Sequence, residues 1–167
     1  SYLLKMDPGI DGQLMSGLSI LEDGHIVANG DQHMTTDYTE WISPLAKYQI
    51  AVLQTELKKL WTPAQDPDLA KDGWGLFPGV ATPVTIPEGK YQGVVTMSIW
   101  EKGPDVHDPD YHGEYEAVTS FVSQVAQGLR ANLIECREAG NGTLRVIQKG
   151  MSKESALAAL AAECVIN

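Results

Sequence analysis

Two dipeptides that favour tight turns, Asp23-Gly24 and Asn141-Gly142, each separate two short apolar segments of this chain. The flanking segments are Leu18–Glu22, His25–Ala28, Leu133–Glu138 and Thr143–Gln148. Two-residue hairpin turns need positive φ angles, which aspartate, asparagine and glycine tolerate. The sequence therefore predicts two β-hairpins. In the second hairpin, a two-residue turn places Glu138 opposite Arg145, a favourable cross-strand pair.

Three segments carry helix signals. Ser43-Pro44 combines a capping side chain with a proline at the first helical position, and Thr62-Pro63 ends the same segment. Its apolar stripe consists of Ala46, Ile50, Leu53, Leu57 and Leu60, widened by Tyr48 and Val52. Asp108-Pro109 repeats the cap and proline before a second amphipathic stretch, and Ser152 caps an alanine-rich helix from Lys153 to about Glu163.

The remaining segments give weaker signals. Tyr2–Met6 and Tyr91–Trp100 are predicted strands, Asp37–Ile42 is a predicted helical turn, and Val80–Ile86 is at most an edge strand because it contains Pro83. Hairpins outnumber strand–helix–strand units. We therefore predict an α+β fold with a mostly antiparallel sheet built from hairpins, on which two long amphipathic helices and a C-terminal helix pack. Residues 1–167 are expected to form a single globular domain.

The net charge of −10 restricts the partners. The first 128 residues hold 18 acidic and 7 basic side chains, and the longest basic run is Lys58–Lys59. Such a chain repels the phosphates of nucleic acids and of anionic membranes. No segment approaches the roughly 18 apolar residues of a membrane span. We expect no nucleic acid and no membrane partner, but a protein partner with a basic surface, or self-association.

The two cysteines, Cys136 and Cys164, are too few for a disulfide framework. This favours a reduced cytoplasmic location, or a virion if the chain derives from a phage. Cys136 lies among the apolar residues of a predicted strand, where a core position is favoured over a role as nucleophile.

The densest group of chemically active side chains lies between residues 105 and 116. The candidate binding residues in it are Asp105, Asp108, Asp110, Glu114 and Glu116. Carboxylates in the first turn of a helix complement the helix dipole, and the helical phase turns His112 and Glu116 away from the apolar stripe. We expect an acidic surface here, with no metal and no cofactor.

The same segment has an alternative interpretation as a metal centre. His107, Asp110 and His112 would hold the ion, and Glu116 would act as the general base of a metal-dependent hydrolase. The chemistry fits, but the outward phase of the helix favours the acidic surface.

A second candidate site lies in a long Pro/Gly-rich loop at about residues 62–90. Trp74 and Phe77 lie among glycines in this loop, and exposed aromatic rings give a large contact area for a protein partner. In the alternative, both rings fold back and fill the core under the loop. Long loops often carry function, so Trp74 and Phe77 are candidate binding residues.

No Gly-x-Ser-x-Gly elbow and no phosphate-binding loop occurs in the sequence. We therefore expect a non-catalytic protein-binding or assembly protein, such as an inhibitor, an immunity-type accessory factor or a phage or virion component. The alternative is the metal-dependent hydrolase.

The predicted element order resembles that of phage tail-terminator proteins. A long helix, an outer strand at Tyr91–Trp100, a polar loop, an amphipathic helix and a hairpin follow one another in both. The resemblance covers about half of the chain and rests on element order alone. It implies a role in assembly.

Overall fold

We describe a computed structural model of the chain. The residues described are 2–3, 18–29, 38–40, 42–102, 115–140 and 142–166. They divide into two compact units, one formed by Ser1–Ser43 with Lys149–Asn167 and the other by Pro44–Gln148. The expectation of a single domain stays a prediction. None of the helices in the described part of the chain has the length and apolarity that crossing a bilayer requires.

The first unit contains a four-stranded antiparallel sheet in the order β1-β2-β3-β4. Its strands are β1 (Tyr2–Leu3), β2 (Leu18–Leu21), β3 (Ile26–Asn29) and β4 (Tyr38–Glu40). Helix α5 (Lys153–Ile166) contacts β2 and the short 3-10 turn η1 (Glu22–Gly24). Residues 38–40 were expected in a helical turn, and this prediction is wrong. Pairing with β3 holds them as a strand.

The first predicted hairpin exists, but its turn is longer than two residues. Leu21 pairs with Ile26, so four residues connect the strands. Glu22, Asp23 and Gly24 have φ angles of 52°, 55° and 92°. Gly24 has no room for a side chain, because a Cβ there would overlap the Ser152 carbonyl group at the start of α5. The turn therefore fits against the helix because residue 24 is a glycine.

The second unit contains a six-stranded antiparallel sheet in the order β5-β6-β7-β8-β10-β9. The strands are β5 (Thr62–Pro63), β6 (Gly75–Leu76), β7 (Val84–Thr85), β8 (Met97–Glu101), β9 (Ile134–Glu138) and β10 (Thr143–Gln148). The helices are α2 (Pro44–Leu60), α3 (Pro67–Lys71) and α4 (Tyr115–Gly128). These elements confirm the predicted α+β class and the antiparallel sheet.

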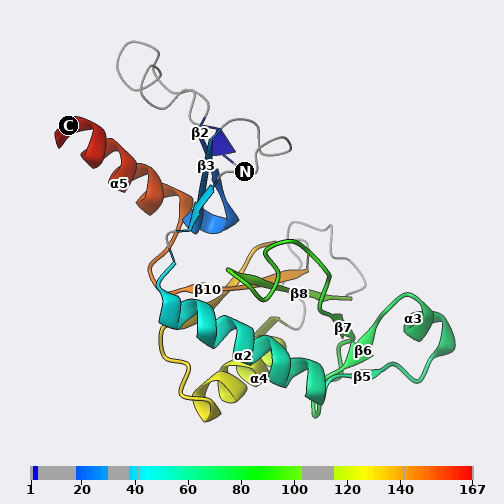
Figure 1. Cartoon of the computed structure of the whole chain (residues 1–167). Helices are drawn as coiled ribbons and strands as arrows, with labels where there is room; N and C mark the ends of the chain where they lie inside the picture. The colour runs from blue at the N-terminus through cyan, green and yellow to red at the C-terminus, as the bar shows by residue number, and fades with distance from the viewer. Residues whose placement is uncertain are drawn as a thin grey trace. The chain divides into compact units, whose positions relative to one another are not determined.

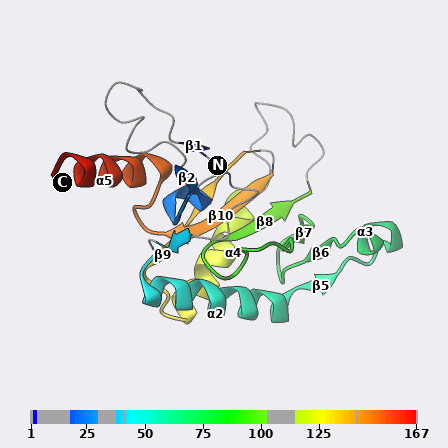
Figure 2. The same ribbon diagram turned by 45° about the horizontal axis from the view of Figure 1, so that its top comes forward.

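Helices α2 and α4 contact each other and the β9–β10 hairpin, and both views show them on the same face of the sheet (Figures 1 and 2). The core between helices and sheet is aliphatic: Ala46, Ile50, Leu53, Leu57, Met97, Ile99, Val118, Val122, Leu144 and Val146. Helix α2 begins and ends where its cap and proline signals predict. Tyr48, expected to widen the buried stripe, is 65% exposed instead. The predicted start of α4 at Asp108 lies outside the described residues.

Two strand predictions need correction. Of Tyr91–Trp100, only the part from Met97 onward is strand, because the chain turns at residues 91–95, where the N–H groups of Val94 and Val95 both donate to the Tyr91 carbonyl oxygen, at 3.1 and 3.0 Å. The Gln92 carboxamide in this turn bonds to the backbone of β8. It donates to the Ser98 carbonyl oxygen at 2.8 Å and accepts from the Ser98 N–H at 2.9 Å. β7 was expected at most at a sheet edge, but it lies between β6 and β8. Pro83 precedes β7 and is not part of the strand.

The β9–β10 hairpin forms in a register one residue away from the prediction. Ala139 N–H donates to the Thr143 carbonyl oxygen at 2.8 Å, so three residues form the loop. Arg145 consequently lies opposite Arg137, and the predicted Glu138–Arg145 pair is wrong. The Arg145 guanidinium donates instead to the Ser98 hydroxyl oxygen at 2.7 Å.

Candidate binding pocket

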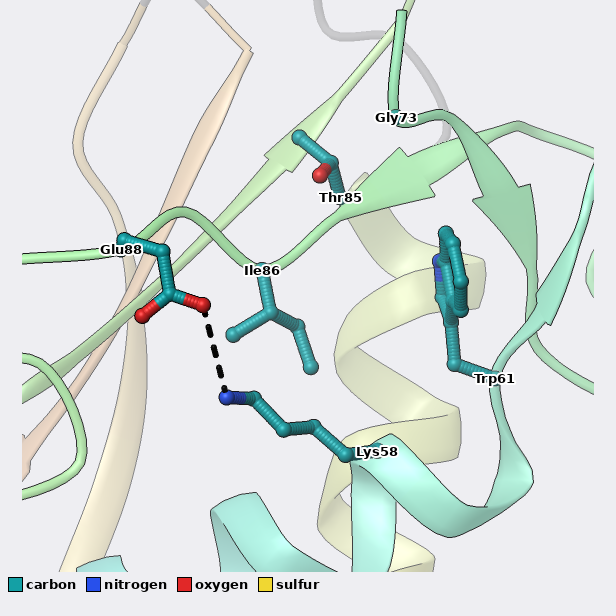
Figure 3. Close-up of a pocket in the computed structure, with 6 residues that line it drawn as sticks. All are labelled: Lys58, Trp61, Gly73, Thr85, Ile86 and Glu88. Carbon is teal, nitrogen blue, oxygen red and sulfur yellow. Dashed lines mark ion pairs between the residues drawn. The ribbon is translucent and has the colours of Figure 1, made fainter. Parts of the chain in front are cut away.

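The second unit has a pocket where the C-terminal end of α2 meets the segment 62–90. Its volume is about 390 Å³. The lining residues are Lys58, Trp61, Gly73, Thr85, Ile86 and Glu88 (Figure 3). Ligand sites are typically concave, largely apolar and about 300–1,000 Å³ in volume, with a few polar groups that fix orientation. The volume of this pocket lies within that range, and its lining combines apolar and polar side chains.

The Trp61 ring forms one wall of the pocket. Its position is fixed at both ends, because Trp61 N–H donates to the Leu57 carbonyl oxygen at 3.0 Å and the indole Nε1–H donates to the Val84 carbonyl oxygen at 2.9 Å. The ring also lies directly over Gly75, where a Cβ would overlap it. The ring is therefore held in place jointly by α2, β6 and β7, and this wall of the pocket is preorganised.

A charged pair lies at the other side of the pocket. The Lys58 ammonium nitrogen and a Glu88 carboxylate oxygen are 4.0 Å apart and point toward each other (Figure 3). The Lys58 side chain is 46% exposed and the Glu88 side chain is 95% exposed. A pair this long and this exposed contributes little to stability, because water screens it. Either charge is therefore available to a ligand.

The lining offers one carboxylate, one amine, one hydroxyl and one aromatic ring. It can pair with a charge, stack on a flat or cationic group and shield an apolar stem.

The pocket lies at the segment 62–90 that the sequence indicated, but neither Trp74 nor Phe77 is among its lining residues. Phe77 is 1% exposed and stacks on Phe121 with ring centroids 4.9 Å apart. Its expected exposure is wrong, and the folded-back alternative holds for this ring. Trp74 is half-buried, with the Lys102 ammonium 5.3 Å from its ring centroid. A binding role for Trp74 stays a prediction.

The residues that line the pocket were missed because no motif joins them. Trp61 and Glu88 are far apart in the sequence, and the approach of β6 and β7 brings them together. The one available signal was the position of Trp61, directly after the last residue of an amphipathic helix and directly before a Pro/Gly-rich segment. An aromatic ring between a helix and the segment after it has one face on which that following segment can pack.

Most of the predicted acidic surface lies outside the described residues. This applies to Asp105, His107, Asp108, Asp110, His112 and Glu114. Glu116 is described, and its side chain in the first turn of α4 is exposed while Val118 is buried, as the helical phase predicts. Across the described segments, no three His, Cys, Asp or Glu side chains are grouped to hold a metal ion. The metal-centre alternative stays a prediction.

Cys136 in β9 is a free thiol. Burial raises the pKa of this thiol from 9.0 to about 11, a hydrogen bond with Ser123 offsets part of the rise, and the Glu135 carboxylate adds to it. A thiol is a nucleophile only as the thiolate, so the raised pKa suppresses reactivity. This agrees with the interpretation of Cys136 as a structural residue.

We expect Cys136 to react slowly with a thiol-alkylating reagent. At pH 8 a thiol with a pKa of about 11 has about a hundredfold less thiolate than one with a pKa of 9.0. Iodoacetamide labelling of a Cys164→Ser variant, followed by mass spectrometry, measures the rate. The same variant unfolded in urea is the control and should be labelled about a hundredfold faster. Equal rates in both states would contradict the burial of the thiol.

No family model, curated protein or solved structure matches this chain. The resemblance in element order to phage tail-terminator proteins therefore stays a prediction, and the function is inferred from the site itself.

Proposed function

We propose that this chain is a non-catalytic protein-binding or assembly protein, and that its pocket receives a basic side chain of a protein partner. The observation that carries this proposal is that the Trp61 ring and the Glu88 carboxylate line the same pocket, on opposite sides of it. An aromatic face attracts a cation through its quadrupole, and a carboxylate pairs with it.

Charge supports a cationic ligand over an anionic one. Between Pro44 and Gln148 the sequence has 13 acidic and 9 basic residues, a net charge of −4. The Glu88 side chain is almost fully exposed and forms only a 4.0 Å contact with Lys58. An incoming cation can replace that contact, because the long Lys58 side chain can turn into solvent at little cost.

Arginine suits this pocket better than lysine. A guanidinium group is planar, so it can stack on an indole ring or donate two parallel hydrogen bonds to a carboxylate, whereas an ammonium group is a compact point charge. The hydrophobic Ile86 side chain lies between the Trp61 ring and the charged pair (Figure 3). It provides an apolar surface for the methylene stem of the arginine.

The proposal predicts saturable binding of a blocked Gly-Arg-Gly peptide. We expect a dissociation constant on the order of 1 mM, since a single side chain supplies all of the affinity. The Trp61 indole N–H resonance should shift in heteronuclear NMR spectra during the titration. Glu88→Gln should weaken binding about fivefold, because a partly exposed ion pair contributes up to about 1 kcal/mol.

Two controls make this experiment specific. Glu154→Gln removes the same charge from the exposed first turn of α5 and should leave the affinity unchanged. A peptide with citrulline in place of arginine has the same shape without the charge and should not bind. Equal weakening by both variants, or equal binding of both peptides, would rule out recognition of arginine at this pocket.

A further inference from the structure

β9 forms one edge of the six-stranded sheet. Its five residues, Ile134–Glu138, pair with β10 on one side, and no other strand of the described chain pairs with it on the other side. An edge strand offers a row of backbone N–H and C=O groups to any strand that can approach.

The hydrogen bonding of the hairpin shows which backbone groups face outward. The bond from Ala139 N–H to the Thr143 carbonyl oxygen makes these two residues a hydrogen-bonded pair. Hydrogen-bonded and non-hydrogen-bonded pairs alternate along an antiparallel ladder. Arg137 and Glu135 therefore also bond to β10. The residues whose N–H and C=O groups point away from β10 are Ile134, Cys136 and Glu138.

The side chains along this edge carry opposite charges at alternate positions. Glu135 and Arg137 lie on the same face of the strand, and the Arg137 Nε–H donates to the Glu135 carboxylate at 2.6 Å. Their side chains are 33% and 40% exposed. Arg145 lies opposite Arg137 on the β10 side, which places two like charges next to each other.

We propose that β9 is a dimerisation strand, which pairs antiparallel with β9 of a second copy of this chain about a two-fold axis at Cys136. In this register Glu135 lies opposite Arg137 of the second copy, and Arg137 lies opposite its Glu135. Both contacts are non-hydrogen-bonded pairs, in which the Cα atoms are only about 4.5 Å apart. Each dimer thus gains two cross-strand ion pairs.

The backbone groups support the same register. The outward-facing groups of Ile134 meet those of Glu138 in the second copy, and those of Cys136 meet their own symmetry mates. Two strands with three outward-facing residues each form about six new hydrogen bonds. The carboxylate from the second copy also offsets the repulsion between Arg137 and Arg145. The pairing joins the two six-stranded sheets into one continuous sheet.

Other registers that keep these backbone bonds are less favourable. Moving the two-fold axis by one residue places either Glu135 opposite its own copy or Arg137 opposite its own copy. Like charges that face each other across a ladder are destabilising. The strand therefore favours one pairing register and disfavours the neighbouring registers, as a specific interface requires.

Charged residues on an edge strand can also serve to prevent pairing. A strand that carries a single sign of charge repels a second copy of itself. Glu135 and Arg137 carry opposite signs at positions two apart, so a second antiparallel copy is attracted. The pocket beside Trp61 takes no part in this interface, so the inference does not depend on the proposed function.

The test uses the complete chain and two charge-reversal variants. Sedimentation velocity at increasing concentration should show a reversible wild-type dimer. Glu135→Arg places two cations opposite each other in both cross-strand pairs, and Arg137→Glu does the same with two anions. Each variant should weaken the dimer about tenfold or more, because two attractive pairs become repulsive.

An equimolar mixture of the two variants should form a heterodimer. Each chain then carries the charges that the other lacks, and both cross-strand ion pairs are restored although neither chain keeps its internal ion pair. Heterodimer formation also shows that both variants are folded. The proposal is overturned if the wild type is a monomer at several hundred micromolar, if the single variants dimerise as the wild type does, or if their mixture remains monomeric.

Discussion

Replacing Phe77 with alanine is expected to lower the free energy of unfolding by about 3–5 kcal/mol, the usual cost of deleting a buried phenylalanine ring. Phe77 is 1% exposed, and its ring lies nearly parallel to that of Phe121, at an interplanar angle of 20°. The substitution removes this stacking and leaves a cavity beside α4. Equilibrium unfolding in urea, followed by circular dichroism, measures the loss.

A matched control is Leu45→Ala, at a position in α2 that is 56% exposed. It should change stability by less than about 0.5 kcal/mol, because its side chain removes little surface from water. If Phe77→Ala costs less than about 1 kcal/mol, the segment 62–90 does not share the core of the second unit. A large loss instead shows that this segment is anchored, and a pocket built on it can be preorganised.

The features that sequence reasoning predicted correctly depend on interactions between near neighbours. Helix α2 begins at Pro44, as the serine and proline at its start predict from within one helical turn. Ser152 caps α5, and its hydroxyl oxygen accepts a hydrogen bond from Ser155 N–H at 3.0 Å. Such signals are complete within four residues, so the sequence displays them directly.

The features that sequence reasoning missed depend on contacts between residues that are far apart in the sequence. The segment before Met97 forms a turn instead of a strand, and Gln92 in this turn bonds to Ser98 and also donates to the Gln54 side chain of α2 at 3.1 Å. No local pattern reveals that contact. In the β9–β10 hairpin, one additional loop residue changed the partner of Arg145, because register depends on the length of the turn.

The same distinction between local signals and distant contacts applies to the candidate site. Composition and loop length indicated the segment 62–90, but not the side that holds the pocket. Trp61 and Glu88 come together only because β6 and β7 return the chain to the end of α2. Phe77 was expected at the surface because aromatic residues in a glycine-rich segment give the same sequence signal whether they bind a partner or fill a core. Burial decides between these outcomes, and burial is a property of the folded chain.

Replacing Gly75 with alanine is expected to cost about 1–3 kcal/mol of stability and to remove the wall of the pocket. Gly75 is buried in β6, and its Cβ would overlap both the Trp61 ring and the Thr62 carbonyl oxygen. The carbonyl belongs to the paired strand β5 and cannot move without breaking the pairing of Thr62 with Leu76. A Cβ at residue 75 therefore requires both groups to move: the β5–β6 pairing is distorted, and the indole ring shifts and loses its hydrogen bond to the Val84 carbonyl oxygen.

This variant connects the packing of the strands to ligand binding. The Trp61 indole N–H resonance should move toward the position of a solvent-exposed indole, and the arginine peptide should bind at least about fivefold more weakly, because the stacking contact is lost. Gly128→Ala is the matched control, since a Cβ at the end of α4 meets no atom within 4 Å. It should leave the resonance, the affinity and the fold unchanged. If Gly75→Ala leaves the indole resonance in place, the ring does not lie over β6. If the resonance moves but the peptide binds as before, the aromatic wall contributes nothing to recognition, and Glu88 alone attracts the cation.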